Sequence, residues 1–395
     1  MVCVCSLREF SGLKGAAAKS DDSNNNEGPK SLNKRRLVST KSAKKTSKGG
    51  SCGRQRQQHT PTTGAVYTMG NSITSPGNTV IIYNRDETGH LTRVGTVNTG
   101  GLGNVAANSP MGPVSTFPVG DPLGSQNSLI VSDDRNCLLG VNAGSNSFTL
   151  FKILHGYTKL EKTQIVNSYG EFPVSIAQND DLVYVLNAGN DGNIQGYKFD
   201  SDSCTVEYIP QASTSLGNTL TSVPFFVFSP GQISFNQCGE HLVVTNKGKN
   251  EIITYEIERN GSLSNTPVVT SSPGNIPFSF DFDSNGNMYV TEAFGSSSVG
   301  SGNSGAVSSF NLNTDTGALS VITPTVSNMQ TAACWVRYSN GYLYVSNNVA
   351  STISTYSADV TTGQISLLNA IAADEMNGDI AEPLDLELTS DDKYL

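Results

Sequence analysis

One sequence phrase recurs along most of the chain and constrains its fold more than any other feature. The phrase is a strand of the form Val-Tyr-Val-x-Asn, a short turn rich in Gly, Asn and Ser, a second strand ending in an aromatic residue, and a third strand after another turn. Its copies lie at residues 65–97, 138–166, 182–209, 241–270, 288–322 and 342–370. Corresponding positions are 45, 59, 46 and 55 residues apart at Val141, Leu186, Thr245, Thr291 and Ser346. A propeller blade takes about 40–50 residues, so this spacing predicts a β-propeller.

A fourth apolar segment lies between successive copies and would supply the innermost strand of each four-stranded antiparallel blade. The last such segment, residues 383–388, has two possible partners. It could pair with residues 66–69 and close a six-bladed ring, or it could open a seventh blade. The second possibility is favoured, because residues 389–395 repeat the turn and strand-entry pattern and then end. The prediction is therefore an all-β propeller in which six blades have a complete set of three outer strands. It would be a seven-bladed architecture that is cut short at the C-terminus.

Charge divides the chain into two parts. Residues 1–60 carry 13 Lys and Arg against 4 Asp and Glu, which leaves 12 against 30 for the other 335 residues. Residues 1–63 have little apolar periodicity and are predicted to be a disordered basic leader, with the propeller domain at 64–395. The acidic body excludes nucleic acid as its partner, because phosphate binding needs clustered cations. The leader lacks a signal-peptide pattern, which favours the cytoplasm over secretion without assigning a compartment.

Cysteine and histidine spacing gives no sign of a metal site or a disulfide framework. Seven cysteines form no CxxC pair with matching ligands, and the four histidines are scattered. We interpret the cysteines as ordinary small buried residues. No metal and no cofactor are expected, and no run of 18 apolar residues predicts a membrane span.

Several blade phrases resemble a known family. NAGSNSFTLFKI, LVYVLNAGNDGNI, PFSFDFDSNGNMYVTEAFG and QTAACWV are similar to the lactonase-type seven-bladed β-propellers, a family with a 6-phosphogluconolactonase and carboxymuconate-cyclising enzymes. The resemblance covers residues 64–395 and implies the propeller fold and lactone chemistry.

The family's catalytic motifs are changed in this chain. Its His-x-His falls on Ser125 and Asn127, its Arg-His on Gly231 and Gln232, and its Glu on Lys247, while the Asn before that Glu is retained as Asn246. The resemblance therefore implies the fold more specifically than it implies a reaction.

Blade geometry predicts where a binding site would lie. In an antiparallel meander, the starts of the innermost strands and the ends of the second strands share one rim. The candidate ligand-binding residues on that rim are Gln126, Asn142, Asn187, Gln232, Asn246, Lys247 and Asn347. Amides can bind a polar ligand but cannot act as general acids or bases. The alternative for the asparagines is structural, since Asn tolerates left-handed backbone angles and caps turns.

Two ionisable residues are the catalytic candidates. Glu292 stands where four other blades carry Asn and precedes the Gly/Ser-rich stretch 295–305; it could act as a base, or simply be a solvated or turn-capping carboxylate. Arg337 could point into the central channel and hold an anion, or form a salt bridge there with Asp283 or Glu387.

Two functions from different classes remain open. One is hydrolysis or formation of a sugar-derived or muconate-type lactone at the channel mouth, with Glu292 as the base. The other is a non-catalytic propeller that binds a small polar or anionic ligand, or a protein, on the same rim.

Overall fold

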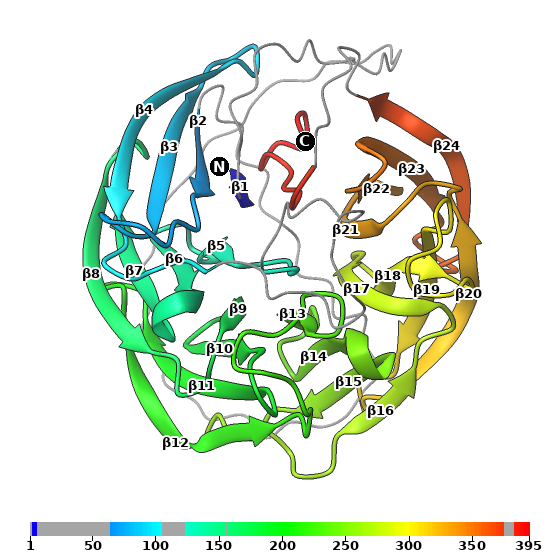
Figure 1. Ribbon diagram of the computed structural model, residues 1–395, viewed down its shortest axis with the longest axis horizontal. Coiled ribbons are helices and arrows are strands. Elements are labelled where there is room, and N and C mark those ends of the chain that lie inside the picture. Colours follow the sequence, from blue (N-terminus) through cyan, green and yellow to red (C-terminus); the bar gives the residue numbers. More distant parts are fainter. Residues whose placement is uncertain (1, 6–63, 105–122, 155, 375–382) are drawn as a thin grey trace, which may run out of the picture.

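A computed structural model describes residues 2–5, 64–104, 123–154, 156–374 and 383–395. These residues form six four-stranded sheets arranged as blades around a central axis (Figure 1). The all-β propeller of four-stranded blades predicted from the repeats is confirmed. The predicted leader lies outside the described residues except for residues 2–5.

The first three blades follow one another along the chain. Blade 1 contains β1 (Val2–Cys5), β2 (Gly64–Met69), β3 (Thr79–Arg85) and β4 (Leu91–Asn98). Blade 2 contains β5 (Leu129–Val131), β6 (Cys137–Asn142), β7 (Ser147–Ile153) and β8 (Leu160–Asn167). Blade 3 contains β9 (Pro173–Asn179), β10 (Leu182–Asn187), β11 (Asn193–Asp200) and β12 (Thr205–Ser215).

The other three blades repeat the same order from the axis outward. Blade 4 contains β13 (Pro230–Phe235), β14 (His241–Asn246), β15 (Glu251–Glu256) and β16 (Val268–Ser271). Blade 5 contains β17 (Asn275–Phe282), β18 (Asn287–Gly295), β19 (Ala306–Leu312) and β20 (Leu319–Ser327). Blade 6 contains β21 (Ala333–Ser339), β22 (Tyr342–Asn347), β23 (Thr352–Ala358) and β24 (Ile365–Asp374).

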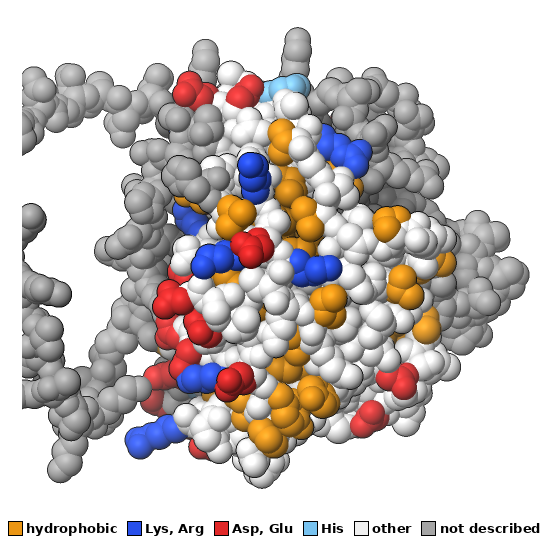
Figure 2. Space-filling view, turned by 90° about the vertical axis from the view of Figure 1, so that its left-hand side faces the viewer, with side chains coloured by type: hydrophobic (Ala, Val, Ile, Leu, Met, Phe, Trp, Pro, Cys, Tyr) orange, Lys and Arg blue, Asp and Glu red, His pale blue; other side chains and the backbone are white. Residues whose placement is uncertain are grey.

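Burial explains the residue pattern of the strands. The second strands lie between two neighbouring blades, so β6 and β14 are buried at all six positions, and apolar residues fill their centres. The outermost strands cover the core with one face only. Leu91, Val94 and Ile165 are exposed on them, and Figure 2 shows hydrophobic side chains scattered among charged and other side chains on this outer side of the ring.

Blade 1 obtains its innermost strand from an unexpected part of the sequence. β1 pairs with β2 in parallel, with Val2 opposite Val66, whereas the described innermost strands of the other blades pair antiparallel. Residues 383–388 form no strand, so they do not pair with residues 66–69, which was the less favoured of the two alternatives for this segment. β1 already occupies the inner edge of β2, which leaves residues 383–388 no ladder to join on that edge.

Residues 383–395, here called the C-terminal segment, lie near the middle of the ring (Figure 1). On one side Arg337 of β21 forms an ion pair with Glu387 at 3.0 Å. On the other side the Tyr394 hydroxyl donates a hydrogen bond to the carbonyl oxygen of Glu87, next to blade 1. The C-terminal segment therefore connects the last blade to the first.

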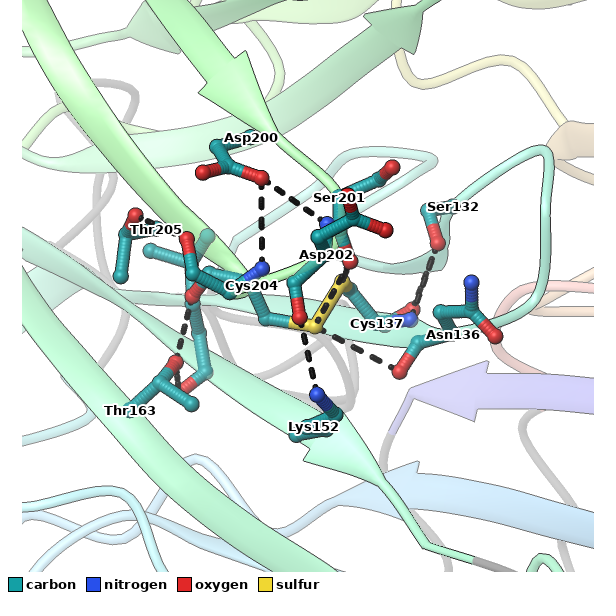
Figure 3. The surroundings of a disulfide bond; sticks show 12 residues. Ser132, Asn136, Cys137, Lys152, Thr163, Asp200, Ser201, Asp202, Cys204 and Thr205 are labelled. Atoms are coloured by element: carbon teal, nitrogen blue, oxygen red, sulfur yellow. Dashed lines mark hydrogen bonds between the residues drawn. A yellow bond between two sulfur atoms is a disulfide. The ribbon is translucent and has the colours of Figure 1, made fainter.

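A disulfide joins blades 2 and 3 (Figure 3). Cys137, at the start of β6, is bonded to Cys204, in the turn before β12, with a Cα–Cα distance of 5.6 Å. The interpretation of these cysteines as ordinary buried residues is wrong. The two residues are 67 positions apart, and only the side-by-side packing of two blades brings them together. Disulfides persist mainly in oxidising compartments, which is opposite to the cytoplasmic expectation.

The described residues contain no helix of the length and hydrophobicity needed to cross a membrane. Within the same residues, no three His, Cys, Asp or Glu side chains gather as metal ligands would.

Candidate functional site

Asparagines at the ends of second strands tie each blade to the link that arrives from the preceding blade. Asn187 donates through Nδ2 to the carbonyl oxygen of Ser168, which follows β8, at 3.0 Å. Asn246 exchanges two hydrogen bonds with Asn218, which follows β12, at 3.1 and 3.3 Å. Both asparagines are fully buried. Their amides therefore lie between blades, where they stabilise the ring.

The other two asparagines of this series make equivalent contacts. Asn347 accepts a hydrogen bond from Asn328, which follows β20, at 2.7 Å and donates to Ser354 at 2.8 Å. Asn142 accepts a hydrogen bond from Asn78 of blade 1 at 3.2 Å. These contacts are structural, but they are not the turn caps expected from the sequence, because Asn142 and Asn246 have φ angles of −126° and −114° and make no side-chain cap hydrogen bond.

The two glutamines bind main chain instead. Gln126 donates through Nε2 to the carbonyl oxygen of Val336 and accepts from its N–H, both at 3.3 Å. Gln232 does the same with Phe280 at 3.0 and 2.7 Å. Each side-chain amide therefore hydrogen-bonds the N–H and the carbonyl oxygen of one residue in an innermost strand, as a neighbouring strand would. Both glutamine side chains are buried.

Lys247 is buried although it carries a charge. Its side chain is 1% exposed, and its Nζ donates a hydrogen bond to the carbonyl oxygen of Gly124. The same Nζ lies 4.3 Å from the centroid of the Phe278 ring, a distance suited to a cation–π contact. Both interactions offset part of the cost of burying the ammonium group.

Glu292, near the end of the long strand β18, is also fully buried. Its Oε1 accepts hydrogen bonds from Ser308 at 2.6 Å, from the Gly274 N–H at 2.8 Å and from Ser272 at 3.1 Å. Its Oε2 has no hydrogen-bond partner among the described residues. Burial raises the pKa of Glu292, although the three hydrogen bonds oppose that shift.

Arg337 is held by the C-terminal segment. Its guanidinium donates to Glu387 through Nε at 3.2 Å and through Nη2 at 3.0 Å, and to the Asn127 side chain at 3.0 Å. Burial disfavours the charged form, but the carboxylates of Glu387, Asp281 and Asp385 outweigh it and raise the pKa of Arg337. Of the alternatives left open by the sequence, the salt bridge with Glu387 is the one that forms.

The two catalytic candidates do not lie in a shared site. Glu292 contacts the link between blades 4 and 5, whereas Arg337 contacts the C-terminal segment. Among the described residues, no hydrogen bond or ion pair connects them or joins them to a common partner.

A small cavity of about 40 Å³ lies on the predicted rim, where innermost strands start and second strands end. Its lining is mostly apolar and is contributed by Phe226, Val227, Ile276, Phe278, Ala293, Phe294, Ala332, Cys334, Asn348 and Val349. The Nδ2 atom of Asn348 is buried and has no hydrogen-bond partner among the described residues. None of the predicted site residues lines this cavity. The apolar run at 225–228, placed in a loop, was the sequence signal that could have located it.

Comparison with known proteins places this geometry in context. A family model described as "Lactonase, 7-bladed beta-propeller" matches residues 191–334. A search of curated proteins gave no significant match.

Solved structures share the fold at low sequence identity. A protein from Bacteroides fragilis, provisionally named a 6-phosphogluconolactonase, is 13% identical with a TM-score of 0.56, covering 81% of this chain and 83% of its own. A Bacteroides uniformis protein with the same provisional name is 15% identical with a TM-score of 0.55, covering 73% and 77%. A Lactobacillus plantarum protein is 14% identical with a TM-score of 0.56, covering 81% and 84%. At this identity the structures show the fold alone.

The repeated blades and the ring of sheets shared with solved structures establish the β-propeller fold, and residues 191–334 are similar to the lactonase-type seven-bladed propellers.

Proposed function

We propose that this propeller is a binding protein whose rim cavity holds the apolar part of a small ligand. The observation that carries the proposal is the buried Nδ2 of Asn348, which lacks a partner and belongs to a residue lining that cavity. An unpaired buried donor costs about 1–3 kcal/mol, and a ligand oxygen placed in the cavity would recover part of that cost. The ligand would be a small ester, lactone or ketone with a carbonyl oxygen to accept this hydrogen bond.

The ionisable residues give this proposal further support. Lys247 is engaged by a carbonyl oxygen and an aromatic ring, and Arg337 by Glu387 and Asn127. Neither cation lines the cavity. Recognition of a neutral carbonyl compound therefore needs no rearrangement of these contacts.

The binding function predicts a ligand-dependent melting temperature. A ligand that binds only the folded state stabilises it by about 2.7 kcal/mol at 100 times its Kd. We expect at least one small lactone or ester to raise the melting temperature of the full chain without being consumed. Asn348→Ala should weaken that ligand about fivefold, since a hydrogen bond contributes about 1 kcal/mol.

Asn369→Ala is the matched control, because Asn369 is an exposed amide on β24 and does not line the cavity. Equal affinity of the Asn348→Ala variant and the parent chain would refute the role assigned to Asn348. A panel of such compounds that leaves the melting temperature unchanged would refute the binding function itself.

A second candidate is turnover of a sugar-derived or muconate-type lactone. The free Oε2 of Glu292 favours it, because an oxygen without a partner can accept a proton from water. In this reaction water adds to the lactone carbonyl carbon and Glu292 takes its proton; the ring C–O bond then breaks, and that proton passes to the leaving alkoxide oxygen. The provisional names of two structural neighbours suggest a phosphorylated sugar lactone as the first substrate to test.

Glu292→Gln distinguishes the two candidates. If Glu292 is the base, the parent chain hydrolyses such a lactone and this variant loses most of that activity while it still folds. Glu171→Gln should keep full activity; Glu171 lies just before the innermost strand β9, at the same rim, and is part-exposed. Absence of turnover in the parent chain removes the enzyme function. A protein partner on the same rim remains a prediction that no specific observation favours.

A further inference from the structure

A turn in blade 4 carries the one Asn-x-Ser/Thr triplet of the whole sequence, Asn260-Gly261-Ser262. It lies between β15 and β16, within the hairpin closed by the bridge between Ile257 and Leu263. The Asn260 side chain is exposed. An exposed triplet of this type in a surface loop is the acceptor sequence for N-linked glycosylation.

The local geometry presents Asn260 to solvent. Its Oδ1 accepts hydrogen bonds from the Ser262 N–H at 3.0 Å and from the Ser262 hydroxyl at 2.7 Å. The asparagine and the hydroxyl residue of the triplet are thus already in contact. No hydrogen bond to the described residues engages the Nδ2 of Asn260, which is the atom that would carry a glycan.

The turn itself is held firmly against blade 3. The Tyr184 hydroxyl donates to the carbonyl oxygen of Gly261 at 2.8 Å. Gly261 has a φ of +80°, a left-handed backbone conformation that favours glycine at this position. Asn260, beside this glycine, is exposed, so a bulky modification there has access to solvent.

An independent observation, a buried disulfide, favours a compartment where this modification occurs. Cys137 and Cys204 form a disulfide between two blades, and both residues are fully buried. A bond buried in this way has to form as the blades come together, which requires oxidising conditions during folding. In eukaryotic cells those conditions are found in the secretory pathway, which is also where N-linked glycans are attached.

We propose that Asn260 is an N-glycosylation site. In the reaction, the Nδ2 nitrogen attacks the anomeric carbon of an oligosaccharide carried on a lipid diphosphate. A carbon–nitrogen bond forms, and the bond from the anomeric carbon to the diphosphate oxygen breaks. The lipid diphosphate leaves with the electron pair of that bond, and Nδ2 loses one proton.

The position of the glycan is compatible with the rim cavity. Turns between third and fourth strands lie on the rim opposite to the ends of the second strands, because consecutive strands of a meander run in opposite directions. The Asn260 glycan and the cavity beside Asn348 therefore lie on opposite faces of the ring. The modification would cover one face and leave the other open.

The test uses the full chain purified from the cells that naturally make it. Intact mass is measured before and after treatment with a peptide N-glycosidase, and the peptide that contains residue 260 is sequenced. We expect a loss of mass on treatment and conversion of Asn260 to Asp. In the same cells, Asn260→Gln and Ser262→Ala should abolish the mass shift.

Ser262→Thr is the matched control, because it changes the same residue but keeps the triplet, and it should retain the glycan. Native chain with an unmodified Asn260 would overturn the proposal. A mass shift that persists in the Asn260→Gln variant would overturn it as well, because it would locate the modification elsewhere.

Discussion

Glu292 occupies the position at which four other blades have asparagine, and the two side chains differ in the hydrogen bonds they can form. An amide both donates and accepts, as Asn246 and Asn347 do with the links beside them. A carboxylate only accepts, so Glu292 gathers three donors on one oxygen and leaves the other without a partner. The buried charge is therefore incompletely compensated.

This environment predicts that Glu292 makes stability depend on pH. Burial raises the pKa of Glu292 above its unfolded value, so the folded chain binds the proton more tightly than the unfolded chain does. The contribution of Glu292 is fully present below the unfolded pKa and is lost as pH rises through the folded pKa. The opposing groups are Ser308, the Gly274 N–H, Ser272 and Thr325, and Tyr356 of blade 6 also lies within range of the charge.

The measurement is urea unfolding of the parent chain and Glu292→Gln at several pH values from about 4 to 8. We expect the variant to gain free energy of unfolding relative to the parent as pH rises, at about 1.4 kcal/mol per unit of pKa difference. Glu171→Gln serves as the control and should follow the parent. An unchanged difference across this pH range would contradict the assignment of a raised pKa to Glu292.

At the scale of elements, the sequence predicted the strands of the blades better than the contacts that join them. The repeated phrase located the outer three strands of each blade because burial between two sheets imposes its pattern on every copy. It could not predict β1, since four residues in a basic leader carry no repeat signal and parallel pairing depends on a free edge. The apolar alternation at Leu384 and Leu386 correctly indicated burial, but those residues pack near the axis without a partner strand.

The C-terminal segment offers an element-scale prediction through the pair Arg337–Glu387. Their side chains are 12% and 27% exposed, so solvent screens the pair only partly. A double-mutant cycle with Arg337→Met and Glu387→Gln should give a coupling energy of about 1–3 kcal/mol in urea unfolding. The matched control is the pair Lys198–Asp181, whose side chains are 56% and 58% exposed.

For the exposed pair, the same cycle should give less than about 1 kcal/mol. Equal coupling energies for the two pairs would show that the C-terminal segment is not fastened by Arg337. This comparison separates a stabilising contact between the last segment and blade 6 from an ordinary surface ion pair.

At the scale of the whole molecule, the candidate site was harder to predict than the fold. The rim was identified from strand direction, and the asparagines and glutamines assigned to it are indeed buried near strand ends. Their partners, however, come from neighbouring blades, and blade-to-blade registry cannot be obtained from one sequence. The cavity is made by residues from two blades and a loop, so no local motif marks it.

The disulfide is the clearest contact between blades that sequence spacing does not reveal. It should contribute strongly to the free energy of unfolding of the ring. In the chain-entropy model, a bond between residues 67 positions apart destabilises the unfolded state by about 4 kcal/mol. The double variant Cys137→Ala/Cys204→Ala should lose about that much free energy of unfolding in urea. Reduction of the parent chain under unfolding conditions should cause the same loss, whereas the double variant should not respond to reductant. If reductant changes the free energy of unfolding of the two chains equally, the bond between blades 2 and 3 contributes nothing to stability. The argument for an oxidising compartment then fails as well.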